Sequence, residues 1–177
     1  MIDHKTGNDL ILSNQANYQK GRDGDVLNRL YFHRTAVKGD TARGEANYFQ
    51  SHVLIASAGV FIDLEGNIEE SVPDSDTAYA VNELDENHIS YSIEFTGMNG
   101  TPLTLPQINS AIKFIKSDST LTKIPNHRLT LTEIPPRKAG GYGNHFDVTL
   151  AYNIKGGHVD GITNAEISAI LKGVYAK

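Results

Sequence analysis

Histidines and carboxylates at widely separated positions are the residues of this sequence that could do chemistry. His33 follows a run of apolar residues, His127 follows "KIPN", and His145 stands two residues before Asp147 in "NHFDV". In an extended segment, residues two apart point to the same face, so we expect His145 and Asp147 to lie side by side. From the residues alone, this pair could bind a metal, exchange protons, or lie on the surface without a role.

Two separated histidines and one carboxylate are the ligand types of a catalytic zinc site, which keeps a fourth position open for water. His33, His127 and Asp147 are our candidate ligands, and Zn²⁺ would lower the pKa of bound water and polarise a carbonyl group. Glu94 is the best-placed general base. The sequence has no HExxH motif, so the spacing alone is not diagnostic. In the alternative interpretation, His33 is a structural sheet histidine and Asp147 a turn carboxylate.

Apolar periodicity indicates the strands that must position these residues. Residues 27–36 are predicted to form a strand with the apolar side chains on one face and His33 on the other. Residues 88–97 alternate in the same way, which puts Glu94 opposite the apolar set. Residues 52–70 are predicted to form strands interrupted by glycines.

Helices are predicted from capping patterns and from apolar residues at helical spacing. Thr104 and Gln107 form one capping-box pair, and Thr163 and Glu166 form another. Residues 40–51 are predicted to form a short helix with Asp40 as its N-cap. Strands mixed with helices imply an α/β fold, a mixed sheet with helices packed on it. We assign residues 1–26 to an N-terminal arm and 27–177 to a single domain.

Composition excludes several classes of protein. A net charge of -5 over 177 residues argues against nucleic-acid binding, and the absence of Cys excludes disulfides and thiol catalysis. No apolar run approaches the roughly 18–20 residues of a membrane span, so no membrane insertion is expected. The polar N-terminus has no visible signal peptide. We therefore expect a chain made in the cytoplasm that another system releases or delivers if it acts outside.

Several segments in a fixed order resemble a known family. Residues 29–150 contain "YFHRTA", "ANYFQ", "SHVLIASAGVFIDL", "HISYSIEFTG", a "Q-x3-A-I-x2-I" helix and "NHR". This order resembles the zinc-dependent N-acetylmuramoyl-L-alanine amidases, the family of phage lysozyme-amidases and peptidoglycan recognition proteins. The resemblance implies a central mixed β-sheet flanked by helices, with a zinc cleft on one face.

The resemblance also implies roles for single residues. His33 stands at the first zinc ligand and His127 at the second, with Asn where the family usually has Gly before it. Asp147 stands at the third ligand but lacks the Pro-Gly that usually follows, and His145 is a competing third ligand. Glu94 matches the glutamate that acts as general base. Many catalytic members carry Lys two residues before the third ligand, where His145 could donate a hydrogen bond to the oxyanion instead.

The activity implied is hydrolysis of the amide between N-acetylmuramic acid and L-alanine in peptidoglycan, and hence lysis of the bacterial cell wall. Two alternatives stay open: a peptidoglycan-binding protein of the same fold without catalysis, and a zinc endopeptidase of the stem peptide. The setting stays open as well. A phage endolysin, an antibacterial effector with an immunity or inhibitor protein, and a recycling enzyme all fit the sequence.

Overall fold

Five strands form the central sheet of this computed structural model, which describes residues 10–137, 139–158 and 160–176. Their order is β4-β3-β6-β2-β7. The four strands that run parallel to one another are β3 (Val60–Ile62), β6 (Ser90–Phe95), β2 (Arg29–Arg34) and β7 (Gly141–Asn144). At one edge, β4 (Ile68–Glu70) pairs antiparallel with β3.

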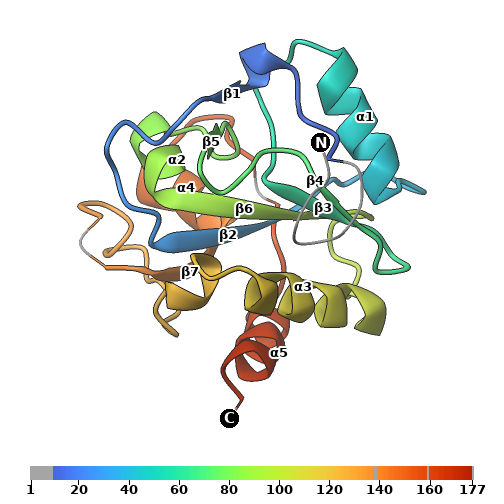
Figure 1. Cartoon of the computed structure of the whole chain (residues 1–177). Helices are drawn as coiled ribbons and strands as arrows, with labels where there is room; N and C mark the ends of the chain where they lie inside the picture. Colours follow the sequence, from blue (N-terminus) through green and yellow to red (C-terminus); the bar gives the residue numbers. More distant parts are fainter. Residues whose placement is uncertain (1–9, 138, 159, 177) are drawn as a thin grey trace.

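Helices cover both faces of this sheet (Figure 1). One face carries α3 (Leu105–Ser117) and α5 (Asn164–Tyr175), which pack against each other. On the other side lie α1 (Ala42–Ser51), α2 (Leu84–Ile89) and α4 (His145–Ala151). This arrangement confirms the predicted single α/β domain. Within the described residues, no helix has both the length and the apolar character needed to cross a membrane.

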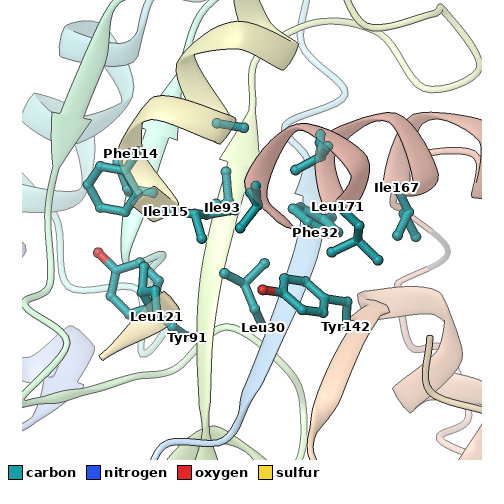
Figure 2. Close-up of a cluster of buried hydrophobic side chains, with 14 of the residues drawn as sticks. Leu30, Phe32, Tyr91, Ile93, Phe114, Ile115, Leu121, Tyr142, Ile167 and Leu171 are labelled. Atoms are coloured by element: carbon teal, nitrogen blue, oxygen red, sulfur yellow. The ribbon is translucent and has the colours of Figure 1, made fainter. Parts of the chain in front are cut away.

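The main core lies between the sheet and the α3/α5 layer (Figure 2). Leu30 and Phe32 enter it from β2, and Ile93 and Phe95 enter it from β6. Because side chains alternate along a strand, the residues between them point to the opposite face, as the sequence predicted. That opposite face therefore receives His33 and the polar residues of β6.

The observed starts of the helices and strands agree with some of the predicted starts and differ from others. Both predicted capping boxes are present, at Thr104 in α3 and at Thr163 in α5. The N-cap of α1 is Thr41 rather than the predicted Asp40, since the Thr41 hydroxyl accepts a hydrogen bond from Gly44 N. The predicted strands over 52–70 begin only at Val60.

"NHFDV" is helical, and its predicted extended conformation is wrong. Asn144 ends β7 and caps α4, which begins at His145. Asp147 occupies the third helical position, and its carboxylate accepts a hydrogen bond of 2.7 Å from Asn144 N. This reciprocal capping box makes a helix start more stable than an extended segment here. His145 and Asp147 are therefore separated by helical rotation and do not share a face.

The described part of the predicted N-terminal arm packs closely on the domain. Residues 15–17 form a short 3₁₀ helix, η1 (Gln15–Asn17), and β1 (Tyr18–Gln19) pairs antiparallel with β5 (Thr77–Ala78). Arg22 Nη1 donates to three backbone carbonyls between 87 and 90. Residues 1–9, with His4, lie outside the described residues. The boundary at residue 26 stays a prediction.

A buried ion pair fastens the segment between His127 and Asp147 to the sheet. Arg29 Nη1 lies 2.6 Å from Glu86 Oε1, and neither side chain is exposed. Tyr31 donates a hydrogen bond of 2.6 Å to the same oxygen, and burial together with the Glu86 charge raises the pKa of Tyr31 well above its usual value. The other guanidinium N–H groups donate to the backbone carbonyls of Glu133, Ile134 and Ala139.

Replacing Glu86 by alanine is expected to lower the free energy of unfolding by about 3–5 kcal/mol, because the buried charge of Arg29 would lose its counterion. Guanidinium denaturation at neutral pH measures this change. The control is Asp85→Ala on the same helix, where the exposed Asp85 pairs with Arg137 at 3.2 Å. That variant should lose less than about 1 kcal/mol. Equal losses in the two variants would show that burial of the pair does not matter.

Candidate metal centre

The carboxyl ends of the parallel strands bring three of the predicted site residues together. His33 of β2 is in register with Glu94 of β6, and Glu94 is in register with Phe61 of β3. On the other side of β2, β7 ends at Asn144, and His145 follows directly. Open α/β sheets bind ligands in the crevice beyond the carboxyl ends of their strands. The site therefore lies where this fold places ligand sites.

Asp160, from the loop before α5, completes a group with the two histidines. His145 Nδ1 lies 2.9 Å from Asp160 Oδ1, and His33 Nδ1 lies 3.4 Å from Asp160 Oδ2. The two imidazole rings are 4.9 Å apart between centroids. One potential ligand atom from each residue lies within 4.8 Å of the others, and all three side chains are buried.

The donor atoms of this group fit a metal ion. His33 Nε2 and His145 Nε2 are both buried and have no hydrogen-bond partner within the part of the chain that the structure describes. Buried polar atoms are normally paired, so two unpaired imidazole nitrogens in one group are unusual. Two imidazoles and a carboxylate are ligand types of catalytic zinc sites, which leave a further position for water. These three residues could therefore hold a metal ion.

The charges of the group suit ligation as well. Burial lowers the pKa of His145, and the adjacent Asp160 opposes this only in part. Burial alone would raise the pKa of Asp160, but hydrogen bonds and charges from His145 and His33 leave it below its usual range. A metal binds neutral imidazole and ionised carboxylate. Both groups thus favour the protonation state that a metal requires.

Glu94 lies beside this group. Its Oε2 atom is 4.0 Å from His33 Nδ1, and its side chain is 17% exposed. Burial raises the pKa of Glu94 well above its usual value, and the negative charges of Asp160, Glu45 and Asp40 add to the rise. A cation bound nearby would oppose this effect, because it favours the ionised carboxylate.

A cleft of about 530 Å³ opens over these residues. Its polar lining includes the His33–His145–Asp160 group, Glu94 and the exposed His158. The ring of His158 stacks on that of His145, with centroids 5.4 Å apart and an angle of 14° between the planes. The apolar part of the lining comprises Phe49, Ile55, Ala56, Phe61, Ala80, Val81 and Leu84. A substrate with both polar and apolar parts would fit such a cleft.

Two of the predicted ligands lie outside the group. His127 is half exposed, and its Nε2 atom lies 2.9 Å from Glu133 Oε1. Asp147 caps α4, and its Oδ2 atom lies 2.8 Å from Arg128 Nη2. Neither residue lines the cleft. Their side chains contact Glu133 and Arg128, respectively, and not His33.

The sequence interpretation overlooked Asp160. Asp160 follows His158 at the same His-x-Asp spacing as the pair at 145 and 147, so "HVD" was an available signal. The Asn144 and Asp147 pair was also readable as a capping box, which assigns Asp147 a structural role. Choosing between the two His-x-Asp pairs depends on a contact between β7 and the loop before α5, which local spacing does not reveal.

Comparison with known protein families shows which family the chain belongs to. The family model for N-acetylmuramoyl-L-alanine amidase matches residues 7–156. This chain belongs to the N-acetylmuramoyl-L-alanine amidase family, which confirms the resemblance seen in the sequence and supports peptidoglycan amidase activity. No curated protein matches the chain significantly.

Solved structures of amidases share the fold. A Staphylococcus aureus hydrolase, AmiA, in complex with its ligand has a TM-score of 0.64 and 14% identity, over 89% of this chain and 78% of that one. An AmpD derivative has a TM-score of 0.61 and 16% identity, over 96% and 98%. The endolysin amidase LysCS from Clostridium intestinale has a TM-score of 0.53 and 17% identity, over 82% and 84%. At these identities the likeness concerns the fold.

Proposed function

We propose that this chain hydrolyses the amide between N-acetylmuramic acid and L-alanine with a zinc ion held by His33, His145 and Asp160. The observation that carries the proposal is the buried His-His-Asp group, which lines the cleft together with Glu94. Its two imidazole Nε2 atoms have no hydrogen-bond partner among the described residues. In this assignment His145 takes the role of second ligand that the sequence suggested for His127. Asp160 takes the role of third ligand that it suggested for Asp147. The sequence also indicated His145 as a ligand, in competition with Asp147 for the third position.

The bound zinc would polarise the carbonyl group and lower the pKa of the attacking water. Glu94 is the proposed general base, because its carboxylate lies at the same end of the sheet as the ligands. It takes a proton from the attacking water and returns a proton to the leaving amine of L-alanine. Because one carboxylate carries out both proton transfers, no second side chain is needed as the general acid.

His158 is the proposed donor to the oxygen that gains charge during attack. The family resemblance implies a donor two residues before the third ligand, and with Asp160 as that ligand the position falls on His158. His158 is largely exposed to the cleft and stacked on His145, so its ring is oriented while its N–H groups remain accessible. A positioned N–H donor stabilises developing negative charge on oxygen.

Digestion of purified peptidoglycan sacculi by the purified chain tests the reaction. Mass spectrometry should find intact stem peptides that begin with L-alanine, together with glycan strands freed of peptide. Shortened stems still attached to muramic acid would instead identify an endopeptidase. Binding to sacculi without any release, by the zinc-loaded chain, would identify a binding protein.

The cell wall is the proposed place of action. In the setting of an antibacterial effector, an immunity or inhibitor protein is the proposed partner. The cleft is where such an inhibitor would bind if it blocked turnover directly. A partner that inhibits hydrolysis but leaves the cleft open would bind elsewhere.

A further inference from the structure

Ile55 has a backbone conformation that its side chain disfavours. Its φ is +53°, in the left-handed region, and no other β-branched residue of the described chain lies there. A β-branched residue with positive φ is a genuine outlier and costs free energy. Such strain persists only where the surroundings fix it, and it gathers at ligand-binding positions. Ile55 therefore calls for an explanation in its surroundings.

Asn17 fixes the backbone around Ile55. Its side-chain oxygen accepts hydrogen bonds from Leu54 N at 2.7 Å and from Ile55 N at 3.0 Å. Its side-chain nitrogen donates to the carbonyls of Phe49 at 2.9 Å and His52 at 2.8 Å. Asn17 is fully buried, and these four bonds use the whole capacity of its amide. A single buried side chain thus determines the path of the segment that contains Ile55.

The strained side chain is not packed inside the protein. Ile55 is 74% exposed, yet it lines the metal cleft together with Phe49 and Ala56. Val53, two residues earlier, is similarly exposed at 65% but does not line the cleft. Packing within the protein therefore does little to offset the strain at Ile55. A ligand in the cleft could cover this side chain.

We propose that Ile55 determines substrate specificity by contacting an apolar part of the peptidoglycan substrate, and that Asn17 is the positioning residue that holds Ile55 at the cleft. The inference rests on the proposed function, since it needs peptidoglycan in this cleft. The amide to be cut has a lactyl methyl group on one side and an alanine methyl group on the other. Apolar groups of this kind gain free energy when they pack against an exposed isoleucine.

Steady-state kinetics on a soluble muropeptide test the proposal. Ile55→Gly should raise KM about tenfold, as expected when part of an apolar contact is lost, and leave kcat within twofold. A contact made equally in the ground state and the transition state changes KM alone. The melting temperature should not fall, because glycine adopts positive φ freely. Val53→Gly is the matched control and should leave KM unchanged.

Asn17→Ala should raise KM by a similar factor, and adding Ile55→Gly to it should raise KM no further. Titration calorimetry in the Glu94→Gln background gives a second readout, in which Ile55→Gly should weaken muropeptide binding about tenfold. A wild-type chain that cuts no muropeptide would refute the proposed function. A wild-type chain that cuts, with Ile55→Gly changing KM less than twofold or lowering only kcat, would overturn the role of Ile55.

Discussion

The Asp160→Ala variant is expected to lose zinc and, with it, hydrolysis of the muramoyl–alanine amide. Loss of a residue that only hydrogen-bonds to a metal ligand already lowers metal affinity by about 10- to 100-fold, so removal of a ligand itself should lower it at least about 100-fold. The reason lies in the geometry, because Asp160 is the carboxylate within 3.4 Å of both histidines. Zinc content after dialysis against a weak chelator, with activity on muropeptide, measures the effect.

Asp147→Ala is the matched control, since both changes remove one aspartate. Asp147 caps α4 and pairs with Arg128, so its loss should lower stability by about 1 kcal/mol and leave zinc bound. Circular dichroism on both variants separates loss of metal from loss of fold. Zinc retained in Asp160→Ala but lost in Asp147→Ala would reverse the ligand assignment.

The Glu94→Gln variant is expected to keep its zinc and to lose about 10²- to 10⁴-fold in kcat, the usual contribution of a general base. Glutamine has nearly the same shape as glutamate but cannot take a proton from water. The change therefore removes the chemistry of the side chain and leaves the cleft intact. Measurement of kcat and zinc content on the same preparation keeps the two effects apart.

Glu83→Gln is the control for Glu94→Gln, because Glu83 is a second carboxylate that lines the same cleft. It belongs to the start of α2 rather than to the ends of the parallel strands, and its loss should change kcat less than tenfold. Similar losses in both variants would indicate a general effect of cleft charge. Near-normal turnover by Glu94→Gln would remove Glu94 from the mechanism.

Local patterns in the sequence predicted the elements that carry the site. Alternation placed His33 and Glu94 opposite the apolar faces of β2 and β6, and parallel pairing of these strands then sets them side by side. The capping boxes at Thr104 and Thr163 located the starts of α3 and α5. These features depend on residues within a few positions of one another, so they can be read without tertiary information.

The third member of the His33–His145–Asp160 group could not be placed in this way. Asp160 lies in a loop without periodicity, and its position follows from long-range contacts such as the bond from Arg34 N to its carboxylate. His127 was predicted as a ligand because "NHR" resembles the family's turn at the second ligand, but its Nε2 atom lies 2.9 Å from the carboxylate of Glu133. The capping-box pattern at Asn144 and Asp147 is local, but it does not show that Asp160 lies beside His145. That proximity follows from contacts between β7 and the loop before α5, such as the bonds between Asn144 and Ile162.

Anomalous diffraction at the zinc edge, from crystals of the zinc-loaded active chain, tests the central claim most directly. The account predicts one strong peak within about 2.0–2.2 Å of ligand atoms from His33, His145 and Asp160. A peak bonded to His127 or Asp147, with the His33–His145–Asp160 group empty in the same crystal, would contradict it.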